Sequence, residues 1–400
     1  MPTLMTTGPV FPRLPQPPGS GLREHGFAIA WMLALSVLIL NFGEVLGLGN
    51  INAFEKLLFL AAAACYLHGK ALDPVAAAGL GLVSAAVLAA GLLTPFPAYS
   101  WGRALFALIA LLSLAAFYLA PPSDAQRGLV LRSVAWIPVA LLAYGMLLAA
   151  VFGKPLYMRD HTGAMRLGGA TIPAFMAAAS YAGSVAASFQ YGCTRRFRYL
   201  LLAVLALAIC AMSGTRMPTA CATASVVQIL LLSMRSAGAR LALIACGSML
   251  SCAFLMTAGS QIVIRILSGS SSGREKIWGA LLPWVERYPF TGVGFGHHGM
   301  LIPDHVTRLT NTTAAHNEYL RLLVELGYAG ETAFLAGMAL LFLGAVGRRP
   351  PLQFFSALML LAVFFLYAAT DNVFYLSYAL ITPLCIALGM PRLEAGREKP

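Results

Sequence analysis

Uncharged apolar stretches recur along almost the whole of this chain of 400 residues. At about 20 residues each, they are long enough to cross the hydrocarbon core of a bilayer, and they predict about twelve helices. The predicted helices are residues 27–47, 53–69, 74–94, 102–120, 129–152, 168–190, 199–213, 217–234, 239–259, 317–346, 354–370 and 373–390. We therefore expect an all-α, polytopic integral membrane protein.

The composition agrees with this fold class and excludes some partners. The chain is 59% hydrophobic and only 10% charged, far from a soluble average. Its net charge of +12 comes from cations in short loops rather than from a basic stripe on a soluble face. This distribution argues against nucleic acid as a partner and favours contacts with anionic lipids. The seven cysteines form no CxxC motif or Cys/His cluster, so neither a disulfide framework nor a metal site is predicted.

The distribution of cations predicts the orientation. Most Lys and Arg residues fall in alternate loops, which are cytoplasmic by the positive-inside rule. The proline-rich start lacks a clear cleavage site, so the first apolar run is expected to be a retained span. The predicted segments are a cytoplasmic disordered tail (1–26), nine helices (27–259), a periplasmic loop with catalytic motifs (260–316), three helices (317–390) and a cytoplasmic tail (391–400).

The long loop carries cations that the orientation rule does not explain. Arg265, Arg274, Lys276, Arg287 and Arg308 all lie on the outer side, where cations work against the rule. The run from Arg274 to Arg287 has the spacing of an amphipathic interfacial helix, with Trp278 and Trp284 on it. We expect the chemistry of the protein, if any, at this loop.

Two motifs on the outer face are suited to phosphate. In Ser213-Gly214-Thr215-Arg216 one apolar helix ends and another begins, so Arg216 either lies among lipid headgroups or presents a guanidinium to a polar cavity. Gly273-Arg274 precedes Trp278 and the run PFTGVGFG (289–296). Gly292 and Gly294 are not surrounded by a βαβ pattern, so we interpret them as a tight turn over a bound group rather than a dinucleotide site.

A histidine stands at the entrance of a long apolar helix. The sequence Ala315-His316-Asn317-Glu318 opens that helix, and a histidine in a first turn is kept neutral by the helix dipole. A lone loop histidine is more often structural, but a neutral imidazole here can accept a proton. A secondary candidate is the loop with Lys154, Arg159, Asp160, His161 and Arg166, whose cations are suited to guiding an anionic substrate. HExxH and P-loop motifs are absent from the sequence.

The order of these motifs resembles the O-antigen ligase superfamily, which includes O-antigen ligases and O-antigen or exopolysaccharide polymerases. The resemblance rests on Ser213–Arg216, on Gly273-Arg274 to Trp278, on Pro289–Gly296, and most specifically on AHNEYLRLLVELGYAG (315–330). It implies a catalytic role for His316 and diphosphate binding by Arg216 and Arg274, with Arg265 as an alternative second arginine. Asn317, Gly292, Gly294 and Trp278 are the supporting residues.

The resemblance also implies what the protein acts on. Members of this superfamily pass a glycan from a polyprenyl (undecaprenyl) diphosphate carrier to an acceptor hydroxyl, with no metal or cofactor, at the periplasmic face of the bacterial inner membrane. The acceptor is lipid A core for a ligase, which we favour because the outer loop is compact, or a second carrier-linked unit for a polymerase. A transporter or flippase remains an alternative, because Glu331 and Asp371 are predicted near helix interiors.

Overall fold

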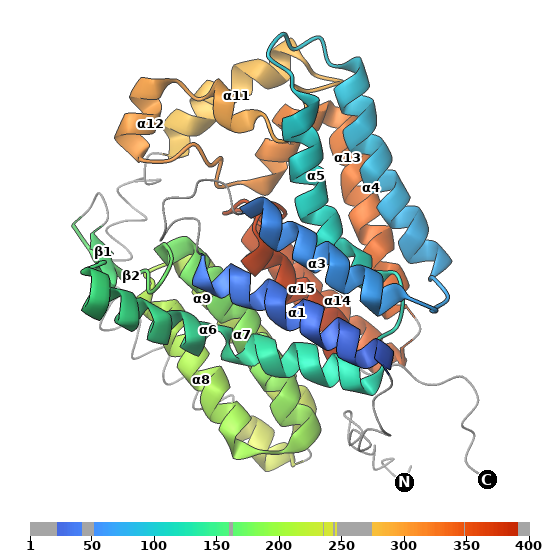
Figure 1. Cartoon of the computed structure of the whole chain (residues 1–400), viewed down its shortest axis with the longest axis vertical. Coiled ribbons are helices and arrows are strands. Elements are labelled where there is room, and N and C mark those ends of the chain that lie inside the picture. The colour runs from blue at the N-terminus through green and yellow to red at the C-terminus, as the bar shows by residue number, and fades with distance from the viewer. Residues whose placement is uncertain are drawn as a thin grey trace.

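The computed structural model describes residues 22–41, 52–159, 163–234, 236–242, 245, 274–347 and 349–390. Helices make up most of this part of the chain (Figure 1). In chain order its elements are α1 (Leu22–Leu40), α3 (Asn52–Leu67), α4 (Pro74–Leu93), α5 (Trp101–Ala115), η1 (Ala116–Tyr118), α6 (Asp124–Phe152), β1 (Tyr157–Arg159), β2 (Met165–Leu167), α7 (Pro173–Thr194), α8 (Phe197–Met212), α9 (Arg216–Ser233), α11 (Arg274–Arg287), η2 (His298–Leu301), α12 (Asp304–Thr310), α13 (Glu318–Val346), α14 (Pro351–Ala368) and α15 (Ser377–Gly389).

Most observed helices overlap the predicted ones, but α1 begins at Leu22, inside the tail predicted as disordered (1–26), and α7 begins at Pro173 rather than at residue 168. Residues 42–47 and most of 239–259 lie outside the described residues. The helix ends follow local chemistry. Asp73 accepts hydrogen bonds from the first backbone N–H groups of α4, whose first residue is proline, a position that needs no N–H donor. Ser123 and Gln126 form a capping box at the start of α6, and Gly153 ends that helix in a left-handed conformation (φ 66°).

Several helices have the length and composition of membrane spans. Within the described residues, five are long and apolar enough to cross a bilayer. They are Pro74–Leu93, Trp101–Tyr118, Asp124–Phe152, Glu318–Val346 and Pro351–Ala368, and α1, α8 and α15 contain shorter apolar helices. The chain therefore has the character of an integral membrane protein, while the total of about twelve spans stays a prediction.

Helix α7 forms the centre of the bundle. It is buried along most of its length and packs against α6, α8, α9 and α15. Ala, Ser and Gly residues let these neighbours come close: a Cβ at Gly183 would lie 2.5 Å from the Pro138 ring of α6, and one at Gly389 would lie 2.3 Å from the Phe189 ring. Small residues at helix contacts are typical of membrane bundles, because packing drives association there.

Helices α4 and α13 cross with their backbones in direct contact. A Cβ at Gly79 would lie 2.4 Å from the backbone nitrogen of Leu341, and one at Gly337 would lie 2.8 Å from the carbonyl oxygen of Gly79. Gly337 therefore allows the close packing of α13 against α4. This crossing holds the membrane half of α13 in place.

The crossing gives a stability prediction with an internal control. Gly79→Ala forces two backbones apart and is expected to destabilise the protein by about 1–3 kcal/mol. Gly81, on the same helix, has open space around it, so Gly81→Ala should be neutral or stabilising by about 0.5–1 kcal/mol. Unfolding of both variants in detergent micelles measures the difference. Equal effects at the two positions would contradict the packing assignment.

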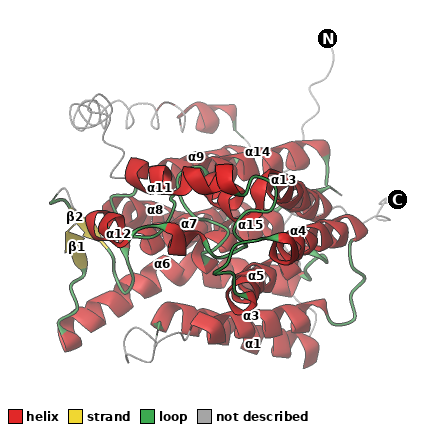
Figure 2. Ribbon diagram, turned by 90° about the horizontal axis from the view of Figure 1, so that it is seen from above, coloured by secondary structure: helices red, strands yellow, loops and turns green. Residues whose placement is uncertain are grey.

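Two connections between the long helices contain structure of their own: the β1–β2 hairpin and residues 274–316. Figure 1 shows α11 and α12 at the top of the molecule and the β1–β2 hairpin at its left edge, and Figure 2, seen from above, shows α12 and the hairpin at the same edge. Residues 274–316 are a structured unit there, as expected of the long loop. They pack around a second, smaller hydrophobic core that includes Ile277, Leu281 and Val293, separate from the core of the bundle.

Candidate active site

The structure brings His316 next to an acid that lies far away in the sequence. The Nδ1 atom of His316 is 3.4 Å from Oδ1 of Asp371, which lies in the connection between α14 and α15. His316 is a quarter exposed, so its ring reaches both the carboxylate and the surroundings. With Nδ1 facing Asp371, Nε2 is the nitrogen left for a reacting group.

Local structure fixes the position of His316. Its backbone is left-handed (φ 49°), an uncommon conformation for a residue other than glycine. Two contacts hold it: the Trp278 indole N–H donates to the carbonyl oxygen of Ala315 at 2.8 Å, and the Asn317 side chain accepts from the backbone N–H groups of Tyr319 and Leu320. The predicted supporting residues Trp278 and Asn317 thus flank the histidine on both sides.

The prediction that His316 lies in the first turn of the long helix is wrong. Helix α13 begins at Glu318 with Asn317 as its N-cap, so His316 precedes the cap and does not lie in the first turn. The helix dipole acts mainly within the first and last turns. The Asp371 carboxylate, rather than the dipole, is therefore the group that orients this imidazole.

Asp371 is kept ionised by its hydrogen bonds. Burial raises the pKa of this carboxyl. The pKa is lowered by the hydrogen bond and charge of His316, by the Asn372 backbone N–H and by the Tyr367 hydroxyl, and it lies below the ordinary value. The Tyr367 and Asn372 donors lie at 3.1 and 2.9 Å. The sequence predicts Asp371 only as a charge near a helix interior, because sequence spacing does not reveal contacts between distant segments.

The third residue of the candidate site is Arg274, which comes from helix α11. It opens α11, one turn before Trp278, and its side chain is partly buried. Burial lowers the pKa of Arg274, the charge of Asp371 raises it, and the charge of Arg166 lowers it. The charges of Asp371 and Arg166 therefore both act on Arg274.

The Ser213–Arg216 motif forms a turn that is held by the hairpin. Gly214 is left-handed (φ 67°), and the Ser213 hydroxyl hydrogen-bonds the Thr215 hydroxyl at 2.6 Å. The Arg166 Nε atom on β2 donates to the carbonyl oxygen of Ser213 at 3.0 Å. Arg216 is the first residue of α9 and is exposed. Arg166, one of the cations of the secondary candidate loop, thus contacts the turn that precedes Arg216.

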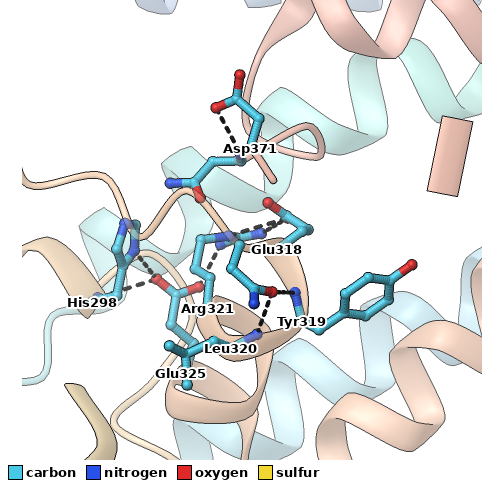
Figure 3. Close-up of polar contacts among 9 residues, drawn as sticks. His298, Glu318, Tyr319, Leu320, Arg321, Glu325 and Asp371 are labelled. Atoms are coloured by element: carbon cyan, nitrogen blue, oxygen red, sulfur yellow. Dashed lines mark hydrogen bonds and ion pairs between the residues drawn. The ribbon is translucent and has the colours of Figure 1, made fainter. Parts of the chain in front are cut away.

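Beneath the site, a fully buried arginine stands between two glutamates (Figure 3). Arg321 donates to Glu318 through Nε at 3.1 Å and to Glu325 through Nη1 at 2.5 Å, and all three side chains are fully buried. Glu325 also accepts from the His298 ring at 2.6 Å and from its backbone N–H at 3.1 Å. The network connects the first turns of α13 to His298, the first residue of η2.

The glycine-rich run fits a kink in α13. Gly327 has φ 68° inside the helix, which removes regular hydrogen bonds at that point. Val293 and Gly294 donate to the carbonyl oxygens of Val324 and Glu325, and Tyr328 donates to that of Pro289, at 2.8–3.0 Å. A Cβ at Gly292 would lie 2.3 Å from the Glu325 backbone. Gly292 and Gly294 therefore turn over this helix of the same chain, in place of the bound group suggested by the sequence.

Some predicted residues cannot be placed. Arg265, Asp160 and His161 lie outside the described residues. Lys154, from the same loop as Asp160 and His161, donates to the carbonyl oxygen of Ala170 at 3.4 Å, and Arg159 is exposed on β1. The gathered residues are thus His316, Asp371, Arg274 and Arg166, with Arg216 at the adjoining turn.

A family comparison covers most of these motifs. Residues 201–335 match the model of the family described as O-antigen ligase. The likeness to the O-antigen ligase family covers this segment of the chain. The matched segment contains Arg216, Arg274, the glycine-rich run and His316, whereas Arg166 and Asp371 lie beyond its ends. The match supports glycosyl transfer in O-antigen or polysaccharide biosynthesis, as the sequence resemblance implied. A search of curated proteins gives no match.

Proposed function

We propose that the protein is a metal-independent, inverting glycosyltransferase of the bacterial inner membrane, with its site facing the periplasm. It would take a glycan from polyprenyl diphosphate and pass it to an acceptor hydroxyl. The observation that carries the proposal is the His316–Asp371 pair in the field of Arg274. A base beside a guanidinium suits a reaction in which a hydroxyl loses a proton while a diphosphate gains charge.

The His316 ring supplies the base. Nε2 takes the proton of the acceptor hydroxyl as its oxygen attacks the anomeric carbon of the donor glycan. The resulting imidazolium is stabilised by the Asp371 carboxylate on Nδ1, which lies 3.4 Å away. The bond between the anomeric carbon and the diphosphate oxygen breaks, and the polyprenyl diphosphate leaves with its electron pair. Attack from the opposite face inverts the anomeric configuration.

The arginines stabilise the leaving group. The polyprenyl diphosphate becomes more negative in the transition state, so guanidiniums stabilise it more there than in the ground state. Arg274, beside the pair, and Arg216, at the positive end of α9, are assigned to this role. Arg265 stays an alternative second arginine. Membrane lipids would surround the polyprenyl chain, and the donor and the acceptor are the expected partners.

The acceptor decides between two transferase readings. We favour lipid A core, and thus O-antigen ligation, while a second carrier-linked unit would make the protein an O-antigen or exopolysaccharide polymerase. The transporter or flippase alternative was based on two charges, Glu331 and Asp371. Asp371 supports it less, because this residue lies beside His316 in the connection between α14 and α15. Glu331 lies within α13 and is partly buried.

The test combines purified protein in detergent with an undecaprenyl diphosphate-linked glycan. Lipid A core and a second carrier-linked glycan are supplied in separate reactions, each with and without chelator. We expect a product whose new linkage has the opposite anomeric configuration to the donor, in an amount that chelator does not change. Retention of configuration, loss of activity with chelator, or no transfer to either acceptor would refute the proposal.

A further inference from the structure

The Asp371 carboxylate is held at both of its oxygens. Oδ1 accepts from the Asn372 backbone N–H at 2.9 Å and faces Nδ1 of His316 at 3.4 Å. Oδ2 accepts from the Tyr367 hydroxyl at 3.1 Å. The oxygen that meets the imidazole therefore differs from the one that Tyr367 holds. The carboxylate cannot rotate away from His316 without giving up a hydrogen bond in a largely buried place, which is costly.

A turn at the end of α14 brings Tyr367 and Asp371 together. The backbone N–H and the hydroxyl of Thr370 both donate to the Tyr367 carbonyl oxygen, at 2.9 and 3.0 Å. Residues four apart are neighbours on a helix surface, and this turn keeps Asp371 within reach of Tyr367 although the helix ends at Ala368. The local sequence therefore places a tyrosine hydroxyl directly behind the acid that faces His316.

The Tyr367 ring is fixed by the centre of the bundle. It is fully buried and packs against Tyr181 of α7 and against Phe364, with ring centroids 6.0 and 6.4 Å apart. Both contacts are edge-on, an arrangement that aromatic pairs prefer. The Tyr181 hydroxyl in turn hydrogen-bonds the Ser225 hydroxyl of α9 at 3.0 Å. The position of the Tyr367 hydroxyl is thus set by α7 and α9.

We propose that Tyr367 is a positioning residue for the proposed transfer reaction. It keeps the Asp371 carboxylate in the orientation in which Oδ1 faces Nδ1 of His316, so that Nδ1 carries the proton and Nε2 is the nitrogen that accepts one. Because Tyr367 is fully buried, it acts through Asp371 and touches neither donor nor acceptor. The role of His316 rests on the proposed function, but the protonated nitrogen of its ring can be identified without transfer.

Tyr367→Phe removes the hydroxyl and keeps the ring, so the packing against Tyr181 is retained. We expect kcat for glycan transfer to fall by roughly 10-fold, the low end for losing a group that orients a reactive side chain, and KM to change by less than about 2-fold. Solid-state NMR of the ring nitrogens in lipid bilayers, at about pH 8, gives the tautomer of His316 by difference from His316→Ala. The wild type should show the Nδ1–H tautomer alone, and Tyr367→Phe should show both tautomers.

Tyr66→Phe is the matched control. Tyr66 is also almost fully buried, and its hydroxyl donates to the Ala120 carbonyl oxygen at 2.6 Å. This variant therefore loses one buried hydrogen bond as well, but none that reaches Asp371, so kcat and the His316 tautomer should stay unchanged. No change in Tyr367→Phe, or equal changes in the two variants, would overturn the positioning role.

The wild-type tautomer keeps the proposal testable if Tyr367→Phe does not fold. A carboxylate held in one orientation selects one tautomer, so a mixture at His316 in the wild type contradicts the proposal whatever the variant does. A wild type that transfers no glycan, but whose single tautomer is lost in Tyr367→Phe, would refute the proposed function alone. Transfer by the wild type, with rate and tautomer both unaltered in Tyr367→Phe, would refute the positioning role alone.

Discussion

Replacement of His316 by alanine is expected to reduce glycan transfer by about 10²- to 10⁴-fold, the usual contribution of a positioned general base. The loss should appear in kcat, because the acceptor and the diphosphate would still bind. Single-turnover transfer from the undecaprenyl diphosphate-linked glycan measures it directly. Asp371→Asn keeps the shape of the partner but removes the charge that stabilises the imidazolium, so a smaller loss, again in kcat, is expected.

Two controls separate chemistry from folding. Asp304→Asn, on the exposed start of α12, also removes a carboxylate from this side of the protein and should leave transfer unchanged.

The Asp371 carboxylate has a lowered pKa, so its stabilising effect is complete above the ordinary aspartate value and is lost as the pH falls through the folded-state value. The stability that Asp371 contributes through its lowered pKa should therefore decrease as the pH falls below about 4, the ordinary aspartate value. Full activity of His316→Ala would refute its assignment as the base.

Arg321→Met is expected to give a large loss of stability, about 3–5 kcal/mol, because it leaves two carboxylates without their buried partner. Glu318 and Glu325 are fully buried on either side of this arginine. Unfolding by denaturant in mixed micelles measures the change in the free energy of unfolding. Transfer should fall only in proportion to the folded fraction, because Arg321 is fully buried and is assigned no contact with substrate.

A combined variant isolates the cause of that loss. In Glu318→Gln/Arg321→Met/Glu325→Gln no buried charge remains among the three positions, so it should be more stable than Arg321→Met alone. Arg308→Met, at an exposed site on α12, is the matched arginine control and should change stability by less than about 0.5 kcal/mol. A triple variant no more stable than Arg321→Met would show that packing, rather than unpaired charge, dominates.

The helices were predictable from the sequence because apolar length is a local property. Periodic runs and their Gly, Pro and charged breakers located α4, α6 and α13 to within a few residues. The motifs of the candidate site were also local: His316, Arg274 and Arg216 each stand at a helix entrance. Their mutual placement was a different matter, since it depends on contacts between segments far apart along the chain.

The residues that sequence reasoning missed all act across such contacts. Asp371 was counted as an intramembrane charge, and Arg166 was one cation among several in a secondary loop. Asp371 is identified by its contact with His316, and Arg166 by its hydrogen bond to Ser213. Similarly, Gly292 and Gly294 could be read as a turn, but the sequence did not reveal that the turn covers α13.

The kink at Gly327 bears on where the bilayer surface lies. The part of α13 after the kink, residues 328–346, is roughly 28 Å long at 1.5 Å per residue, close to the roughly 30 Å thickness of the hydrocarbon layer. The part before the kink holds Glu318, Arg321 and Glu325, which would be costly in contact with lipid tails. A membrane boundary near Gly327 would leave this charged segment at headgroup depth, where the phosphates of a lipid carrier also reside.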